Sequence, residues 1–378
     1  MTDITILGGG ITGITTAISI QLAGYDTTLY TEYRPDKISE YDAPKALTSM
    51  YAAASIKPST VQKDNLNETL SISQDIFRIL SNTNLSTYQE RHYVLSEKQI
   101  KEPNYKDIVE NFTKIEDKID IPKRKNTDTV NGWYFDTYFV ETLDYIAELY
   151  EYYKKIGGKV EIKYVEKEEF LNLNDDILVN CTGNWSRDLF NDNKMYAHRG
   201  HLIHIPIKNK PKDNRNKYSS YSYKTEDGYS AYAYAHKDKL ILGGTNQKGI
   251  YDSKKDNWEP ISQINQDMIQ VGKNKVPSHI LELNKEIISE FMNFNINTEN
   301  AKSVIGYRPV RDINNKGIRL EREYIQDRPV IHNYGHGGAG VTLSWGCAKE
   351  VIDIINETVT ENNKQSWSDI KSRLTNEL

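Results

Sequence analysis

The chain has 378 residues, of which 38% are apolar and 27% charged, and it carries a formal net charge of −5 with a sequence pI near 6.0. Its length predicts two domains, because a single core rarely grows beyond about 250 to 300 residues. The composition argues against a disordered, a membrane-spanning or a nucleic-acid-binding chain. Two cysteines, Cys181 and Cys347, are too few for a disulfide framework, and the histidines lack the spacing of a zinc site. We therefore expect no metal, no nucleic-acid partner and no membrane partner.

Neither end of the chain shows a recognisable targeting signal. The N-terminus lacks the basic and apolar regions of a secretory signal. The C-terminal residues Thr375-Asn376-Glu377-Leu378 differ from the Ser-Lys-Leu peroxisomal signal. We therefore expect a cytoplasmic protein.

The N-terminal segment has a strand–helix–strand pattern. Ile4–Leu7 is a short apolar run typical of a buried parallel strand, and a helix is predicted from about Thr12 to Leu22, where Gly24 stops it. Asp26–Tyr30 predicts a second strand that ends near Glu32. Such a unit is typical of a doubly wound nucleotide-binding sheet.

Three glycines follow the first strand in the order G-x-G-x-x-G. In dinucleotide-binding folds Gly8 would allow the tight turn, Gly10 would let the backbone approach a pyrophosphate, and Gly13 would let helix and strand pack closely. The helix start at Ile11-Thr12 offers free N–H groups to phosphate, and Glu32 could accept hydrogen bonds from a ribose. A lone glycine triplet also occurs in ordinary turns, but this context favours dinucleotide binding. FAD and NAD both use the motif, which does not separate them.

The rest of the chain predicts a second, more polar lobe and a return to the first. Residues 65 to 122 have mixed periodicity and predict helices and loops, whereas the alternation between 201 and 242 predicts antiparallel strands. The other predicted elements are helices at 137–155, 261–294 and 342–356 and strands at 159–165, 176–180, 303–307 and 330–332.

Four sequence strings follow one another in a distinctive order. They are Val179–Trp185 (VNCTGNW), Gly306–Arg311 (GYRPVR), Ile318–Glu323 (IRLERE) and Ile331–Gly340 (IHNYGHGGAG). In order and spacing they resemble the D-amino-acid oxidase family, and the similarity runs from Ile4 to about Ile355. The resemblance implies an α/β fold: a Rossmann-like FAD-binding domain (1–62, 141–198 and 305–378) and an α+β substrate domain with a large, mostly antiparallel sheet (63–140 and 199–304).

The resemblance also implies which residues hold the cofactor. In the family the glycine loop before the last helix lies against the flavin, where only glycine lacks a side chain that would intervene; the plainer alternative is a helix-capping turn. FAD is expected to be noncovalent, because neither cysteine lies in a stretch that we would assign to flavin attachment. The implied cofactor residues are Gly8, Gly10, Ile11, Thr12, Gly13, Glu32, Arg34, Thr48, Ser49, Ala53, Val165, Thr182, Gly183, Gly337, Gly338, Gly340, Val341 and Thr342.

The implied substrate residues are led by Arg308. Its planar guanidinium matches a carboxylate bidentately, and the matching family arginine holds the substrate's α-carboxylate. The family pattern gives Gly338 a carbonyl that accepts from the substrate amine and Tyr232 a hydroxyl that contacts the carboxylate. The family's lid tyrosine would fall at Gly228, so Tyr229, one step away, becomes the lid residue by proximity. An ordinary ion pair or a core aromatic is the plainer alternative for each of these side chains.

Three positions depart from the family pattern. The first is the lid position, where this chain has Gly228; Tyr223 is a second possible lid residue, so the lid is rearranged or realigned here. Ala54 stands where the family usually has glycine, and Lys57 where it has glutamine or a similar residue. Because this stretch borders the pocket, Lys57 bears on substrate preference.

The reaction implied by the resemblance is the oxidative deamination of a D-amino acid. Hydride passes from Cα to flavin N5, the imino acid hydrolyses to a keto acid and ammonia, and oxygen is reduced to hydrogen peroxide. The expected partners are a small amino acid and oxygen, and the expected state is a monomer or homodimer. The alternatives are a glycine or sarcosine-type oxidase, a biosynthetic oxidase for an unusual or carrier-tethered amino acid, a dehydrogenase that reduces another protein, and a non-catalytic FAD-binding regulatory module.

Overall fold

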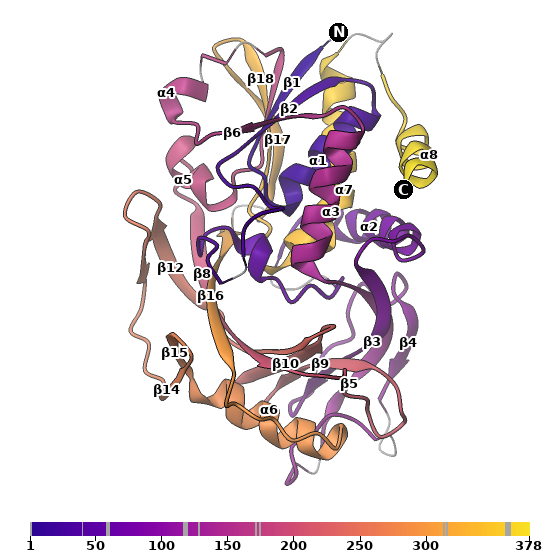
Figure 1. The fold of residues 1–378 in the computed structure, drawn as a ribbon, viewed down its shortest axis with the longest axis vertical. Helices are drawn as coiled ribbons and strands as arrows, with labels where there is room; N and C mark the ends of the chain where they lie inside the picture. The colour runs from indigo at the N-terminus through magenta and orange to yellow at the C-terminus, as the bar shows by residue number, and fades with distance from the viewer. Residues whose placement is uncertain are drawn as a thin grey trace.

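Two large β-sheets at opposite ends of the molecule organise the fold, with the main helices packed beside the upper one in Figure 1. The computed structural model describes residues 2–378 except 40, 58–60, 116–119, 128, 171, 174, 313, 315–316 and 360–363. The protein is a mixed α/β protein, as the sequence predicts. Within these ranges, no helix is both long and apolar enough to cross a bilayer.

The upper sheet has six strands in the order β17-β18-β7-β1-β2-β6. They are β1 (Asp3–Leu7), β2 (Asp26–Thr31), β6 (Lys159–Ile162), β7 (Ile177–Asn180), β17 (Arg319–Ile325) and β18 (Arg328–Tyr334). β1 pairs in parallel with β2 and β7, whereas β17 and β18 form an antiparallel edge. Every residue of β7 is buried, because helices cover both faces of a parallel sheet.

The helices of the upper half are α1 (Ile11–Leu22), α2 (Leu66–Leu80), α3 (Thr142–Lys155), α4 (Lys167–Phe170), α5 (Ser186–Leu189), α7 (Gly340–Thr358) and α8 (Trp367–Glu377). The helices α1, α3 and α7 share one core with one face of the sheet, and α4 and α5 cover its other face. α2 packs on α7, and α8 packs on α1. This arrangement places the start of α1 directly after β1, at the carboxyl edge of the sheet.

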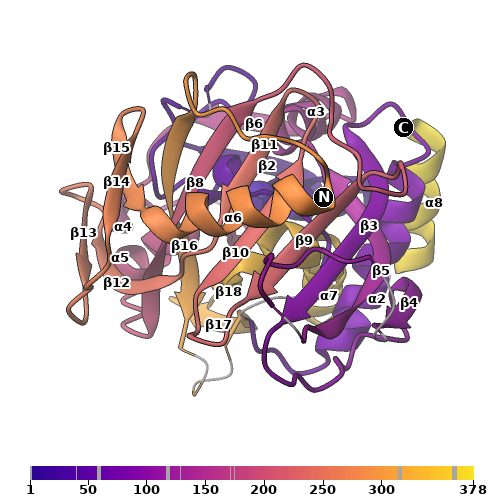
Figure 2. The ribbon, with the colours of Figure 1, turned by 90° about the horizontal axis from the view of Figure 1, so that it is seen from below.

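The lower sheet has ten strands, nine of them in the order β13-β12-β8-β11-β10-β9-β3-β5-β4, with β16 paired to β8. They are β3 (Thr87–Ser96), β4 (Glu110–Lys114), β5 (Asn131–Val140), β8 (Met195–Pro206), β9 (Ser219–Lys224), β10 (Ser230–Ala235), β11 (Lys239–Gly243), β12 (Gln247–Asp252), β13 (Asn257–Pro260) and β16 (Lys302–Arg311). All pairs are antiparallel except β3 with β9. The helix α6 (Ser278–Phe291) lies across one face of this sheet (Figure 2).

A buried carboxylate joins the two sheets. Asp192 accepts hydrogen bonds from Arg311 Nε of β16 at 2.8 Å and from the Tyr334 hydroxyl of β18 at 2.7 Å. Burial alone would raise the pKa of Asp192, but these two donors more than offset it and lower the pKa. The strand that carries Arg308 is thereby tied to the strand that leads into the glycine loop.

Two predicted helices are partly wrong, each at its N-terminal side. The helix predicted at 137–155 begins at Thr142, because the aromatic residues before it form β5, a strand of favourable side chains. The helix predicted at 261–294 begins at Ser278. Residues before it form the hairpin of β14 (Met268–Val271) and β15 (Asn274–Pro277), closed by Gly272 with a φ of +56°.

Three further elements, two strands and a helix, differ from the prediction. The segment expected to hold only helices and loops also forms β3, which pairs with β5 and with the distant β9, and β4, which pairs with β5. The helix α8 was not predicted, although Ser366 caps it by accepting from Asp369 N at 3.1 Å, a signal of the Ser-x-x-Asp kind. The division into domains stays a prediction; β16 crosses the predicted boundary at residue 305 and belongs wholly to the lower sheet.

Candidate cofactor and substrate site

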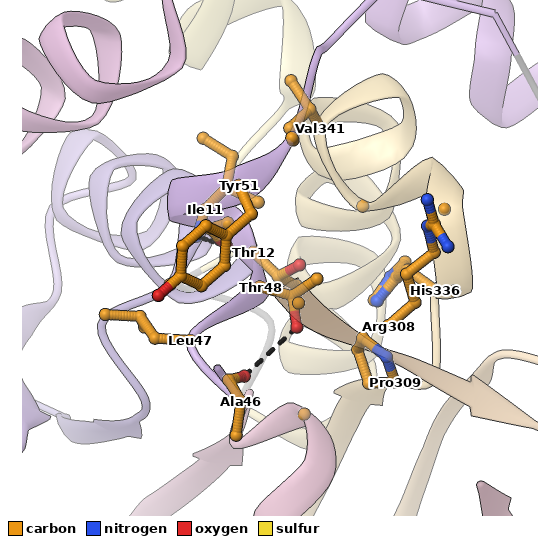
Figure 3. Close-up of a pocket in the computed structure, with 18 of the residues that line it drawn as sticks. Ile11, Thr12, Ala46, Leu47, Thr48, Tyr51, Arg308, Pro309, His336 and Val341 are labelled. Carbon is orange, nitrogen blue, oxygen red and sulfur yellow. Dashed lines mark hydrogen bonds between the residues drawn. The ribbon is translucent and has the colours of Figure 1, made fainter. Parts of the chain in front are cut away.

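A single elongated cavity of about 620 Å³ runs from the carboxyl edge of the upper sheet to the lower sheet. One end is walled by the turn after β1 and by residues near the ends of β2 and β7, and the other by β8, β10 and β16. Figure 3 shows residues from both ends, with Ile11 and Thr12 on α1 and Arg308 on β16. The cavity therefore joins the predicted nucleotide-binding turn to the predicted substrate residues.

The glycine turn after β1 has no room for side chains. Gly8 has a φ of +104°, and a Cβ there would lie 2.6 Å from the Cys181 carbonyl oxygen. A Cβ on Gly13 would overlap the Gly8 carbonyl, so α1 and the turn can pack closely only with glycine. The first N–H of α1, at Ile11, donates to Ser49 Oγ at 3.0 Å, and Thr12 lines the cavity beside it. The remaining N–H groups of this turn suit an anionic phosphate.

Acidic and small residues wall the cavity next to this turn. Glu32 lies on the wall and accepts from the Tyr33 hydroxyl at 2.7 Å. Burial and this carboxylate raise the pKa of Tyr33, which keeps the phenol protonated as a donor. Val165, which follows β6, and the Thr182-Gly183 turn, which follows β7, also line this part of the cavity, and Thr182 Oγ1 donates to Asn180 Oδ1 at 2.7 Å.

A second glycine turn forms the wall before α7. Gly335 and Gly337 have φ values of +89° and +56°, and Gly338 is the most exposed residue of the turn. His336 is buried, its Nε2 has no hydrogen-bond partner among the described residues, and burial lowers its pKa to about 4. An exposed glycine backbone beside an unsatisfied ring nitrogen is a surface on which a flat polar ring can lie.

The start of α7 holds a neighbouring segment of the cavity wall in place. Thr342 Oγ1 is within hydrogen-bonding distance of the carbonyl oxygens of Ser55, at 3.3 Å, and Lys57, at 3.1 Å. Thr48 Oγ1 donates to the Tyr307 carbonyl at 2.6 Å. The segment from Thr48 to Lys57 is thereby attached to both β16 and α7. Gly340, Val341 and Ala53 also line the cavity there.

Arg308 and Tyr232 lie against glycines of neighbouring strands. A Cβ on Gly200 would meet the Arg308 guanidinium at 2.5 to 2.7 Å, and one on Gly243 would overlap the Tyr232 ring. Arg308 Nη1 also donates to the Thr245 carbonyl at 3.0 Å. Burial raises the pKa of Tyr232, and the nearby Arg308 opposes that rise. The result is a cation and a neutral hydroxyl donor side by side in the cavity wall.

Three of the predicted site residues lie outside this cavity wall. Gly13 is behind it, in the helix contact described above. Arg34 forms an ion pair with Asp36 instead. Tyr229 is in the exposed turn before β10, with its ring against His279 at 4.8 Å. All other predicted residues line the cavity.

Other residues on the wall were not predicted. Tyr234, two residues beyond Tyr232, and His336 both line the cavity; the strand alternation and the glycine string were the available signals. Tyr223, the second possible lid residue, is buried and donates to Glu97 Oε1 at 2.8 Å. Ala54, which stands where the family usually has glycine, has a φ of +46°. The backbone at this position thus keeps the conformation that glycine favours.

Comparison with known proteins assigns the chain to a class and then to a family. The model of the DAO family, described as FAD dependent oxidoreductase, matches residues 3–354. The chain is 28% identical over 367 residues to a D-amino-acid oxidase of Dictyostelium discoideum, covering 94% of this chain and 92% of that one. It is 25% identical over 374 residues to a D-aspartate oxidase of Homo sapiens, covering 94% and 95%.

Solved structures share the fold. Glycine oxidase from Bacillus cereus aligns with a TM-score of 0.60 at 13% identity over 95% of this chain and 96% of that one. L-proline dehydrogenase from P. horikoshii aligns with a TM-score of 0.65 at 14% identity over 95% and 94%. Fold, cavity and family match together define an FAD-dependent oxidoreductase. Within this class, the chain belongs to the DAO family, which here includes D-amino-acid and D-aspartate oxidases.

The residues of the cavity fit the cofactor of this family. A Cβ at Gly8 or Gly13 would collide with the backbone, a Cβ at Gly335 would lie 2.9 Å from Arg311 Cβ, and the α1 start offers N–H donors. Among the described residues, His336 Nε2 has no hydrogen-bond partner. FAD is an elongated molecule with a nucleotide at one end and a flavin at the other. Its shape therefore matches a cavity that joins a nucleotide-binding turn to the predicted substrate residues.

Proposed function

We propose that the protein is an oxidase of D-amino acids that releases a keto acid, ammonia and hydrogen peroxide. The observation that carries the proposal is the pairing of Arg308 with Tyr232 in a cavity that also contains the glycine turn of Gly338. The guanidinium of Arg308 and the hydroxyl of Tyr232 can together bind a carboxylate. The D-amino-acid and D-aspartate oxidases among the relatives support the handedness.

Each residue has a separate task in this proposal. Arg308 binds the substrate's α-carboxylate, and Tyr232 donates a second hydrogen bond to it. The Gly338 carbonyl accepts from the substrate amine, so that three points fix the orientation of Cα. Because the hydrogen leaves Cα with both electrons, this step needs no base to take a proton from carbon.

The cofactor completes the chemistry. When bound, FAD supplies the acceptor for the hydride and passes the two electrons to oxygen. The turn of Gly8 and Gly10 and the α1 start would hold its pyrophosphate, Glu32 its ribose, and the turn before α7 its ring. We propose noncovalent attachment, because burial raises the pKa of the Cys181 thiol to about 12 and also raises that of Cys347. Acid precipitation tests this: noncovalent FAD leaves the pellet.

The activity is tested by product stoichiometry. The purified protein is given D- and L-enantiomers of the same amino acids, glycine and sarcosine under air, and ammonia, keto acid and peroxide are measured. We expect equal amounts of the three products from D-enantiomers only. Turnover of glycine or sarcosine alone, or substrate loss with an artificial electron acceptor but no peroxide, would replace the proposal with a glycine-type oxidase or a dehydrogenase.

A further inference from the structure

The wall of the cavity contains a lysine, Lys57, whose charge no acidic side chain among the described residues balances. The carbonyl of Lys57 is held by Thr342, at 3.1 Å, so the backbone position is fixed. Its side chain lines the cavity among buried groups, and burial lowers its pKa to about 8. Among the described residues, no acidic side chain forms an ion pair with Lys57. A desolvated ammonium without an anion is costly unless a ligand supplies one.

The groups around Lys57 cannot supply the missing negative charge. The Lys57 charge acts on the ring of His92, and burial together with this charge holds the pKa of His92 well below its usual range. Both His92 nitrogens are already paired, with Ser220 at 2.9 Å and Ser222 at 3.2 Å. His336, also on the wall, is neutral for the reason given above. Tyr234, which lines the same cavity, keeps its proton because burial raises its pKa.

A row of aromatic rings connects this lysine to the carboxylate-binding arginine. Tyr232, beside Arg308, packs on Tyr234 with ring centroids 5.1 Å apart, and Tyr234 stacks on His92 at 5.6 Å. His92 in turn feels the Lys57 charge. The two cations therefore stand at opposite ends of this row, and each can bind its own anion.

The charges on the cavity wall also favour an anionic substrate. The described wall residues include four cations, Lys57, Lys163, Lys224 and Arg308, and one carboxylate, Glu32. Glu32 follows β2, in the nucleotide-binding part of the cavity. The substrate end thus has cations and no carboxylate among its described residues, so a substrate with two carboxylates fits it better than one with a neutral side chain.

We propose that Lys57 binds the side-chain carboxylate of the substrate and makes the enzyme selective for acidic D-amino acids. This inference rests on the proposed function, in which Arg308 takes the α-carboxylate. Lys57 is a specificity-determining residue in this proposal, and the hydride step itself does not depend on it.

The test compares acids with their amides. kcat/KM is measured for D-aspartate against D-asparagine and D-glutamate against D-glutamine, in the wild type, in Lys57→Met and in Lys285→Met, whose side chain is exposed on α6. We expect the wild type and Lys285→Met to prefer an acid. Lys57→Met should lower the acid-to-amide ratio by about 10- to 100-fold, as expected for loss of a charged hydrogen bond, and Lys57→Arg should restore part of it. An unchanged ratio in Lys57→Met, or a loss in Lys224→Met instead, would overturn the proposal.

A binding measurement separates this inference from the proposed function. Succinate and butyrate have equal carbon counts and differ in one carboxylate, and their binding is followed by perturbation of the flavin absorbance. We expect succinate to bind the wild type more tightly than butyrate, Lys57→Met to lose that preference, and the preference to decline above about pH 8 as Lys57 deprotonates. If no amino acid is oxidised, the proposed function fails, and the succinate result still decides the role of Lys57. If neutral D-amino acids are oxidised and succinate and butyrate bind equally well, the proposed role of Lys57 is wrong while the proposed function stands.

Discussion

Adding one methyl group at Gly200 should displace the carboxylate-binding arginine without unfolding the protein. An alanine Cβ there would lie 2.5 to 2.7 Å from the Nη1, Nη2 and Cζ atoms of Arg308. Non-bonded heavy atoms prefer separations of about 3.5 to 4.0 Å, so the guanidinium must move by about 1 Å. A misplacement of about 1 Å in a substrate-positioning group can cost about 100-fold in rate, or about 2.7 kcal/mol. We therefore expect kcat/KM of Gly200→Ala to fall by about two orders of magnitude.

The assay is anaerobic stopped-flow reduction of the flavin by the best D-amino acid. Flavin content and the unfolding temperature should stay near the wild-type values, because the displaced atoms belong to the end of a flexible side chain. The matched control is the same substitution in an Arg308→Ala background. Since no guanidinium remains to be displaced, Gly200→Ala should then add little. A rate within about twofold of the wild type, or equal losses in both backgrounds, would refute the reasoning.

Three further predictions concern stability and cofactor binding. Ala54→Gly should raise the free energy of unfolding by about 0.5 to 1 kcal/mol, because a left-handed alanine costs about 1 to 2 kcal/mol and glycine loses part of that gain in the unfolded chain; an unchanged unfolding temperature would count against this. Gly13→Ala should yield protein with little FAD and a lower unfolding temperature, because its Cβ overlaps the Gly8 carbonyl; full flavin absorbance would contradict it. Asp192→Asn should cost about 3 kcal/mol at neutral pH. Because hydrogen bonds such as that from Tyr334 lower the native pKa of Asp192, its contribution is complete above the unfolded pKa of about 3.9 and disappears as pH falls through the native value. In chemical unfolding, the difference in free energy of unfolding between wild type and Asp192→Asn should therefore become smaller at that acidic pH. A difference that stays constant with pH would show that the ionised carboxylate does not provide this stability.

Features that depend on local geometry could be predicted from the sequence. The strand, glycine turn and helix from Ile4 to Leu22 follow from apolar runs and from positions where only glycine fits, and the structure has them within a residue. The strands β3 and β4 could not be predicted in this way. β3 pairs with β9, which lies far along the chain, and a polar segment alone does not reveal which of its residues another strand will cover.

The same limit applies to the site. Arg308 and Tyr232 were identified by resemblance, but their proximity depends on the strands β16 and β10 flanking β8 and β11 in one sheet. Counting residues along the chain predicts Tyr229 as the lid residue, but Tyr229 lies in the exposed turn before β10, outside the cavity wall. In the sequence, Lys57 is only a departure from the family pattern. Its meaning depends on burial and on the missing anion, which are properties of the folded cavity.

The most direct test of an amino-acid oxidase with an arginine-bound carboxylate is anaerobic flavin bleaching in the wild type and in Arg308→Met. Both proteins are mixed with D- and L-amino acids, glycine and sarcosine, and the loss of flavin absorbance is followed. The wild type should be bleached by D-amino acids, and Arg308→Met, with normal flavin content, should need far higher concentrations or fail to bleach. Bleaching of Arg308→Met at wild-type concentrations, or a wild type that no amino acid bleaches, would contradict this function.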